Sequence, residues 1–333
     1  MFAVLKDVEI VTMSRFPVSV VQSRVSTPNY YLFRDFCLAL EKSPLFDLQT
    51  FGLLQDVQVK KRDNLFVFGG EQLFDFKLMK LISLSNNTFV WFTEDPYETE
   101  QNIKSSSLFT KIFTTDEFSV KSYGPNAAFL PLGTIRSPTS GSLVSFQYDL
   151  VLFGSIWPNR LDLIEKLAKN ESTTKLRILL LTSQNSASWV DQARLRQVKN
   201  WIIGNGGEML EITRPLDLAA LGKLLQKARV CLNWPRSFGD KGWSVPGPRV
   251  IEVAMSGKVQ LINSEMQPGI NAILAPNMFL EYNDRDLCEQ IVAALALSDE
   301  LLHNIANLAL EQVKESFTWE RIIENLHQKL ISK

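Results

Sequence analysis

Short apolar runs of strand length alternate with helix-length segments along most of this chain. In the first series, strands are predicted at residues 8–13, 46–53, 65–70, 88–93, 110–114 and 127–130. Helical spacing predicts helices at 30–40 and 71–84, and the polar stretch 14–28 is expected to be a loop. Strands that alternate with helices favour a parallel sheet covered on both faces. The sequence therefore predicts an α/β fold.

The alternation stops once and then starts again. Residues 133–145 (GTIRSPTSGSLVS) are rich in Pro, Gly, Ser and Thr and lack apolar periodicity, which is typical of an interdomain linker. Beyond it, strands are predicted at 148–153, 177–182, 209–213, 230–234 and 259–263, and helices at 158–169, 188–202, 216–228, 248–256, 284–296, 298–315 and 318–331. We interpret the chain as two Rossmann-like domains, residues 1–140 and 141–315, with a cleft between them and a terminal helix at 316–333.

Length, charge and cysteine content exclude several classes of protein. A chain of 333 residues exceeds the usual size of one domain, which agrees with two. Its 35 Lys and Arg balance 36 Asp and Glu, so charge does not favour nucleic acid as a partner. Cys37, Cys231 and Cys288 are widely spaced, which indicates buried thiols in a reduced compartment. With no signal peptide and no bilayer-length apolar run, we expect a cytoplasmic protein without an integral membrane segment.

One strand, loop and helix unit of the second domain carries most of the expected chemistry. Its Gly- and Pro-rich loop and the helix that follows, predicted from Pro248, carry Arg236, Lys241 and Arg249. Such units bind phosphates because a helix N-terminus presents unpaired N–H groups to an anion. Glu252, about one turn into the helix, is placed to accept hydrogen bonds from ribose hydroxyls. The alternative is an ordinary crossover whose glycines form a tight turn and whose arginines are solvated.

Four phrases carry a resemblance to a known family. They are WFTEDPYE (91–98), FTTDEFSVKSYGPNAAFLPLG (113–133), YDLVLFGSIWPNR (148–160) and GWSVPGPRVIEVAMSGKVQLI (242–262). In this order they resemble the CgeB/YkvP-like glycosyltransferases, bacterial proteins related to the broad group of retaining sugar-nucleotide-dependent enzymes. The resemblance implies a GT-B fold, in which two Rossmann-like domains with parallel sheets face each other across a cleft. It also suggests that the terminal helices pack back on the first domain.

The resemblance further implies a donor site on the second domain. Its predicted members are Gly154, Ser155, Arg160, Trp234, Arg236, Lys241, Gly242, Ser244, Pro248, Arg249 and Glu252. Glu252 maps to a Glu that holds the nucleotide ribose, and Gly154, Ser155 and Arg160 map to a turn and basic residue that face the donor diphosphate. Trp234 is a candidate to stack a base or sugar. Because a basic loop at a helix N-terminus stabilises a diphosphate leaving group, we expect no metal and no cofactor, with a nucleoside diphosphate sugar as co-substrate.

Two positions depart from the pattern of retaining GT-B enzymes. Ser244 stands where many of them have a second Glu near the donor sugar, and His303 and His327 both lie in the helical tail rather than in the first domain. The comparable loop of the first domain carries Glu94 and Asp95, which are therefore the candidates for the reacting centre. A carboxylate there can accept the acceptor's proton or offset positive charge at the anomeric carbon. The alternative is a strand-end turn, since Asp before Pro commonly initiates one.

The resulting hypothesis is transfer of a sugar from a nucleoside diphosphate donor to the hydroxyl of an unidentified acceptor, with retention of the anomeric configuration. Two alternatives stay open at this point. A sugar-nucleotide epimerase or phosphorylase can use the same fold, because fold does not dictate reaction. A non-catalytic module that binds a nucleotide sugar is also consistent with the missing second Glu.

Overall fold

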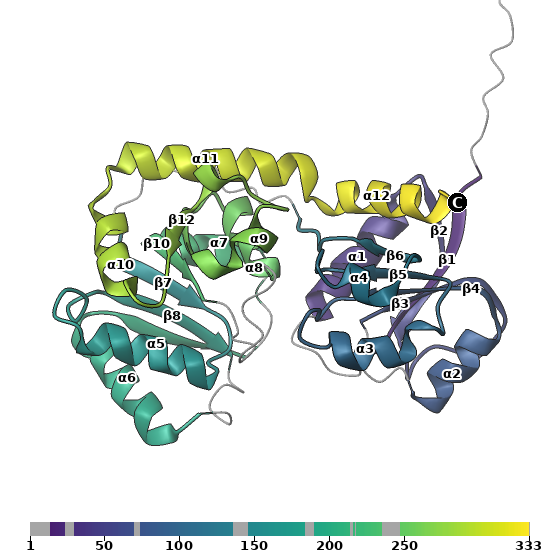
Figure 1. Cartoon of the computed structure of the whole chain (residues 1–333), viewed down its shortest axis with the longest axis horizontal. Helices are drawn as coiled ribbons and strands as arrows, with labels where there is room; N and C mark the ends of the chain where they lie inside the picture. The colour runs from purple at the N-terminus through teal and green to yellow at the C-terminus, as the bar shows by residue number, and fades with distance from the viewer. Residues whose placement is uncertain are drawn as a thin grey trace, which may run out of the picture.

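The chain forms two α/β units that lie side by side (Figure 1). The computed structural model describes residues 14–23, 30–69, 74–135, 146–183, 190–213, 216, 218–234 and 247–332. Within these residues each unit contains a parallel sheet of six strands. The predicted α/β fold with two Rossmann-like sheets is confirmed. None of the helices in the described ranges combines the length and apolar character needed to cross a membrane.

The sheet of the N-terminal unit has the strand order β2-β1-β3-β4-β5-β6. Its elements are β1 (Phe16–Gln22), α1 (Tyr30–Lys42), β2 (Phe46–Leu53), β3 (Arg62–Phe68), α2 (Phe76–Ser83), β4 (Ser85–Phe92), α3 (Thr99–Ser106), β5 (Lys111–Thr114), α4 (Val120–Tyr123) and β6 (Ala127–Phe129). Strand β2 pairs with one edge of β1, whereas β3 pairs with the other edge and the later strands continue outward from β3. The strand order therefore reverses between β1 and β3, which is where open α/β sheets bind ligands.

The prediction of a loop at 14–28 is wrong, because β1 lies inside it. The strand FPVSVVQ is buried from Val18 to Gln22, between β2 and β3. Polar Ser19 and Gln22 interrupt its apolar run, so the sequence pattern does not indicate a strand here. Pairing with β2 and β3 stabilises it. The predicted strand at 8–13 lies outside the described residues. The sequence analysis also missed α3 (TEQNIKSS), whose mostly polar side chains lack helical periodicity.

The sheet of the C-terminal unit has the order β12-β11-β10-β7-β8-β9. Its strands are β7 (Tyr148–Phe153), β8 (Ile178–Ser183), β9 (Glu208–Ile212), β10 (Ala228–Asn233), β11 (Gln260–Asn263) and β12 (Leu280–Tyr282), with helices α5 (Pro158–Lys169), α6 (Gln192–Gly204), α7 (Leu218–Gln226), α8 (Pro248–Met255), α9 (Gln267–Ile270) and α10 (Leu287–Ala296) and the 3-10 turns η3 (Ser264–Met266) and η4 (Pro276–Met278). The strand order reverses between β7 and β10. In Figure 1 the arrowheads of β7 and β8 point toward the N-terminal unit, so their carboxyl ends face it.

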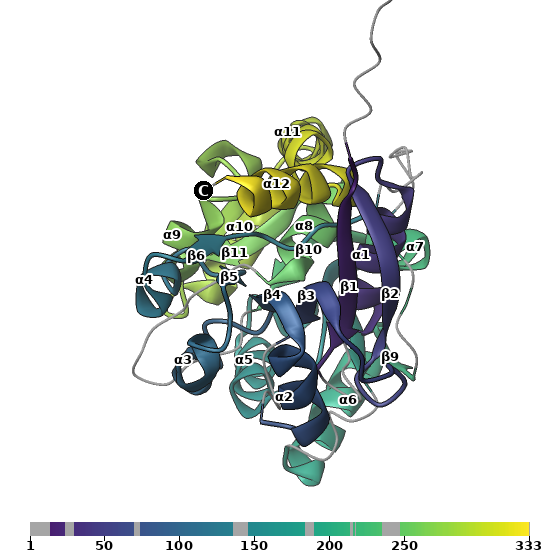
Figure 2. The same ribbon diagram turned by 90° about the vertical axis from the view of Figure 1, so that its right-hand side faces the viewer.

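Two terminal helices, α11 (Asp299–Ser316) and α12 (Trp319–Ile331), bridge the units. At the crossing, Thr134 N donates to Phe317 O (2.9 Å) and Trp319 N donates to Thr134 O (3.0 Å). Trp319 is buried and packs on Phe36 of α1, with ring centroids 5.9 Å apart. A Cβ added at Gly133 would lie 2.6 Å from the Trp319 ring, so only glycine fits there. Figure 2 shows α12 lying against the N-terminal unit beside β1.

The predicted linker at 133–145 begins at this crossing, and residues 136–145 lie outside the described part of the chain. The two histidines flank the crossing and pack differently. His303 is exposed on α11, whereas His327 on α12 packs edge-on against Phe46 with ring centroids 5.4 Å apart. These positions agree with the interpretation that one is exposed and the other structural.

Candidate active site

The carboxyl end of β7 meets the start of α8 where the strand order of the C-terminal sheet reverses. Gly154 follows β7 with a φ of +120°, a value that side chains with a Cβ rarely adopt. A Cβ added there would lie 2.8 Å from Cζ of Arg249, the second residue of α8. The guanidinium of Arg249 also lies 5.8 Å from the ring centroid of Phe153. The structure thus brings Gly154 and Arg249, both predicted donor-site residues, into direct contact.

Two buried side chains hold the backbone of the turn after β7. Trp234 Nε1 donates to Phe153 O (2.9 Å), and Arg160 Nη1 donates to Ser155 O (2.6 Å). The Arg160 guanidinium lies 5.3 Å from the centre of the Trp234 ring, and the two residues are 2 % and 0 % exposed. Neither offers surface to a ligand in this structure. In this structure both side chains support the turn from beneath, and the expected roles of Trp234 in stacking a base and of Arg160 at the diphosphate stay predictions.

The first turn of α8 carries Arg249, whose side chain contacts the turn after β7. Pro248 is the first helical residue, and no described side chain caps the helix at Gly247. Uncapped N–H groups and the helix dipole favour an anion at this end. The hydroxyls of Ser155, in the turn after β7, and of Ser183, the last residue of β8, are 3.1 Å apart. The other predicted members of this site, Arg236, Lys241, Gly242 and Ser244, lie outside the described residues.

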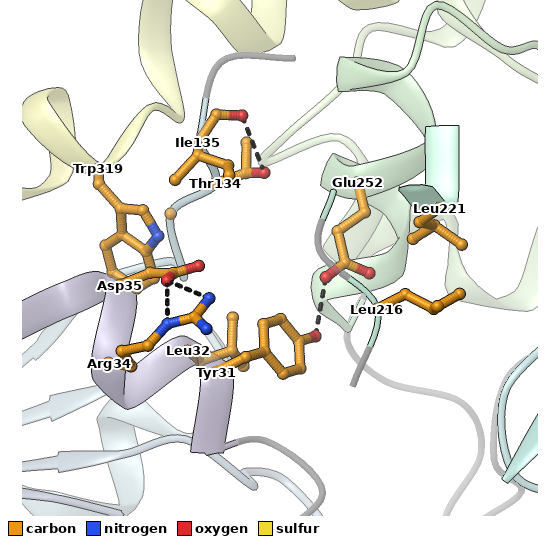
Figure 3. Close-up of a pocket in the computed structure, with 11 residues that line it drawn as sticks. Tyr31, Leu32, Arg34, Asp35, Thr134, Ile135, Leu216, Leu221, Glu252 and Trp319 are labelled. Atoms are coloured by element: carbon orange, nitrogen blue, oxygen red, sulfur yellow. Dashed lines mark hydrogen bonds and ion pairs between the residues drawn. The ribbon is translucent and has the colours of Figure 1, made fainter. Parts of the chain in front are cut away.

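Glu252 lies one turn beyond Arg249 and is 8 % exposed. Its Oε1 accepts a hydrogen bond from Tyr31 Oη at 2.8 Å, although Tyr31 lies on α1 of the other unit, 221 residues away (Figure 3). Burial raises the pKa of Glu252, while the bond from Tyr31 and the charge of Arg249 lower it and Asp35 raises it. Burial and then Glu252 raise the pKa of Tyr31 well above its usual value. The phenol therefore stays protonated and acts as the donor.

A pocket between the two units surrounds this pair (Figure 3). Residues of α1, of the crossing near Trp319, and of the α7–α8 side of the C-terminal unit contribute to its walls. They are Tyr31, Leu32, Arg34, Asp35, Gly133, Thr134, Ile135, Leu216, Leu221, Glu252 and Trp319. Leu216 and Leu221 provide an apolar surface next to the Glu252 carboxylate. An apolar wall thus adjoins a carboxylate that can accept hydrogen bonds.

Asp95 lies in a different environment, inside the N-terminal unit. Its carboxylate is 2 % exposed and accepts hydrogen bonds from Thr114 Oγ1 (2.6 Å), Tyr123 Oη (2.7 and 2.9 Å), Asn102 Nδ2 (2.9 Å) and Thr99 Oγ1 (3.2 Å). Burial raises its pKa, and these hydrogen bonds lower it. Both oxygens are engaged by side chains of α3, α4 and the last residue of β5. In this structure the Asp95 carboxylate joins α3, α4 and β5, and its expected role at the reacting centre stays a prediction.

Glu94 is the other predicted catalytic carboxylate. It follows β4 by two residues and is partly exposed, and it makes contacts of its own. Its position after a parallel strand is consistent with a role at the sheet edge that binds ligands. Its catalytic role stays a prediction.

A comparison with protein families identifies the class of this chain. The sequence profile of the family described as glycosyl transferase-like matches residues 146–328, more than half of the chain. The chain belongs to this glycosyl transferase-like family. It is a glycosyltransferase, and the matched region contains β7, α8 and α11 and most of α12.

Solved structures with the same fold extend the likeness over both units. A glycosyltransferase from Rickettsia africae is 12 % identical, with a TM-score of 0.63, and the match covers 96 % of this chain and 100 % of that one. The N-terminal domain of a Candida albicans trehalose-6-phosphate phosphatase is 10 % identical, with a TM-score of 0.65 and coverage of 96 % and 97 %. An E. coli trehalose-6-phosphate protein bound with UDP-2-fluoro glucose is 12 % identical, with a TM-score of 0.54 and coverage of 93 % and 80 %. These likenesses confirm the GT-B fold. A search of curated protein sequences found no match.

Sequence reasoning missed the pocket residues that come from outside the α8 phrase. Tyr31 and Asp35 lie on α1. Leu216 lies just before α7, and Leu221 lies within it. Tyr31 lies in the first turn of the helix that follows β1, at the strand reversal of the N-terminal sheet, but the sequence analysis missed β1 and so gave no signal for it. No local pattern links it to Glu252, because only the docking of the two units brings them together.

Proposed function

We propose that this glycosyltransferase moves a sugar from a nucleoside diphosphate sugar to an acceptor hydroxyl, with retention of configuration and without a metal ion. The observation that carries the proposal is the convergence of Gly154, Arg249 and Glu252 at the strand reversal of the C-terminal sheet. The four sequence phrases support a place among the CgeB/YkvP-like enzymes. The three cysteines are free and buried, which supports the expected cytoplasmic location.

Arg249 and the start of α8 are assigned to the donor diphosphate. A guanidinium pairs two phosphate oxygens at once, and the adjacent helix N–H groups add donors in a fixed orientation. As the acceptor oxygen bonds to the anomeric carbon, the bond from that carbon to the diphosphate breaks, and negative charge collects on the departing phosphate. Arg249 and α8 stabilise that charge without needing to move. This is the physical basis for expecting metal-independent transfer.

Glu252 and the two leucines are assigned to the nucleoside. The carboxylate accepts hydrogen bonds from ribose hydroxyls, and Leu216 and Leu221 pack against the base. Glu94 is assigned to the proton that the acceptor hydroxyl loses. The E. coli structure with UDP-2-fluoro glucose shares the fold, so UDP is the first nucleotide to test.

The binding test uses isothermal titration calorimetry with UDP, followed by GDP, ADP and dTDP. We expect one of them to bind the wild-type protein and Glu252→Ala to weaken that nucleotide at least tenfold, as is usual when a charged hydrogen-bond partner is lost. Glu208→Ala is the matched control, because Glu208 accepts a tyrosine bond from Tyr148 (2.6 Å) within its own unit. Failure of all four nucleotides to bind the wild-type protein contradicts the proposal.

The chemical test follows turnover. With a donor and an acceptor, the anomeric proton coupling in the NMR spectrum of the product reports retention, and full activity in EDTA reports metal independence. We expect Glu94→Gln to lower kcat about a hundredfold while nucleotide affinity stays unchanged. With donor alone, formation of an isomerised sugar nucleotide would instead identify an epimerase.

A further inference from the structure

The Tyr31–Glu252 bond joins the donor side of the pocket to the other unit. Among the described residues, Tyr31 is the sole hydrogen-bond donor to Oε1 of Glu252, and none donates to Oε2. A carboxylate offers about four lone-pair positions, so a ribose hydroxyl can bind while the phenol stays in place. Tyr31 therefore need not leave when a nucleotide enters.

We propose that Tyr31 is a positioning residue for the donor, which holds the Glu252 carboxylate in the orientation that receives the ribose. The inference rests on the proposed function, because it takes Glu252 as the ribose-binding group. Rotation about the terminal torsion of a Glu side chain has broad, shallow minima. One short bond from a phenol fixes that torsion, and fixing it before binding reduces the ordering cost that the nucleotide meets.

The phenol is itself held in place by the fold. Tyr31 lies in the first turn of α1, the same helix that packs through Phe36 on Trp319 of α12. The crossing at Thr134 joins that tryptophan to the start of the linker. Donor affinity therefore depends on the placement of α1 relative to α8, so that one unit adjusts a site carried by the other.

The charges around Glu252 give this arrangement a pH signature. The described charged and titratable groups that face it are Tyr31, Arg34 and Asp35 on α1 and Arg249 on α8. The hydrogen bond from Tyr31 lowers the pKa of Glu252, against the stronger raising effect of burial. Ribose binding needs the carboxylate form, so affinity is present above this pKa and is lost as the pH falls through it. We call this loss of affinity at low pH the acid limb of binding. Without the phenol the pKa of Glu252 rises, so the acid limb must move to higher pH.

The test measures UDP affinity by calorimetry from about pH 5 to about pH 8, a range that spans the titration of a carboxyl with a raised pKa. The proteins are wild type, Tyr31→Phe, Glu252→Gln and the double variant. Tyr148→Phe is the matched control, because it removes a similar tyrosine–glutamate bond (2.6 Å) inside the C-terminal unit. If UDP does not bind, the nucleotide found in the binding test above takes its place.

We expect Tyr31→Phe to weaken UDP about tenfold near neutral pH and to move the acid limb upward, while Tyr148→Phe changes neither. In the Glu252→Gln background the charged acceptor is gone, so Tyr31→Phe should weaken UDP less than it does in the wild-type protein. Equal affinity and an unmoved limb in Tyr31→Phe, together with weak binding by Glu252→Gln, would overturn the inference and leave the proposed function intact. An equal loss from Tyr31→Phe in both backgrounds would also overturn it, since it would show general damage. Unchanged binding by Glu252→Gln would instead contradict the proposed ribose contact.

Discussion

Asp95 and Glu252 are both buried carboxylates near the carboxyl ends of parallel strands, yet their surroundings differ. Four side chains of its own unit donate to Asp95 and engage both oxygens. A single described side chain donates to Glu252, and it comes from the other unit. A buried carboxylate with all its partners in one unit holds that unit together. A buried carboxylate at a pocket, with one oxygen lacking a described donor, is suited to a ligand.

The largest expected effect tests the structural half of this comparison. Asp95→Ala leaves the hydroxyls of Thr114 and Tyr123 and the amide of Asn102 without their acceptor, and should lower the free energy of unfolding by about 3 kcal/mol. Urea denaturation followed by circular dichroism measures it. If the variant keeps wild-type stability but loses turnover, Asp95 acts in the chemistry and the distinction drawn here fails.

Glu252→Gln tests the other half. The amide oxygen still accepts the bond from Tyr31, so we expect the free energy of unfolding to change by less than about 1 kcal/mol. The lost charge should weaken UDP by about 2 kcal/mol, measured by calorimetry at neutral pH. A protein destabilised as strongly as Asp95→Ala, with unchanged UDP affinity, would reverse the roles of the two carboxylates.

Gly154→Ala tests whether the turn after β7 belongs to the ligand-binding region. The positive φ and the Cβ contact with Arg249 should cost about 1 to 2 kcal/mol of stability and displace the guanidinium, which weakens UDP. Gly124→Ala is the control, because Gly124 has a φ of +83° and no neighbour within 4 Å of an added Cβ. We expect Gly124→Ala to lower the melting temperature through backbone strain and to leave UDP affinity unchanged. A similar effect of both variants on UDP would exclude a specific role for Gly154.

The smallest expected effect is a change in pH dependence. Asp35 raises the pKa of Glu252, so Asp35→Asn should lower that pKa. The acid limb of UDP binding should then move to lower pH, by less than about one unit, opposite to the shift expected for Tyr31→Phe. Calorimetry across the same pH range measures it. A shift to higher pH would contradict the assigned effect of Asp35, because the loss of its ion pair with Arg34 (2.8 Å) leaves a cation that lowers the pKa of Glu252 further.

Local sequence was sufficient for much of the fold. The strands at 46–53 and 148–153 and the helix at 158–169 have the bounds that the sequence predicts. The strand at 148–153 is a buried apolar run ended by Gly154, and the helix begins at Pro158. The strand β1 was missed since its two polar residues are buried by pairing with distant strands. For the site, the phrase around α8 indicated Arg249 and Glu252. It did not indicate that Trp234 and Arg160 are buried beneath the turn after β7, because burial is not visible in a motif.

The sequence by itself determined two parallel sheets, the break between them and the helix that carries the candidate donor residues, because each of these follows from patterns within a dozen or so neighbouring residues. Only the tertiary structure decided which groups face each other across the units. The partner of Glu252 lies 221 residues away on α1, and α12 packs on that helix. Contacts of this kind arise from the docking of whole units, for which no local pattern exists.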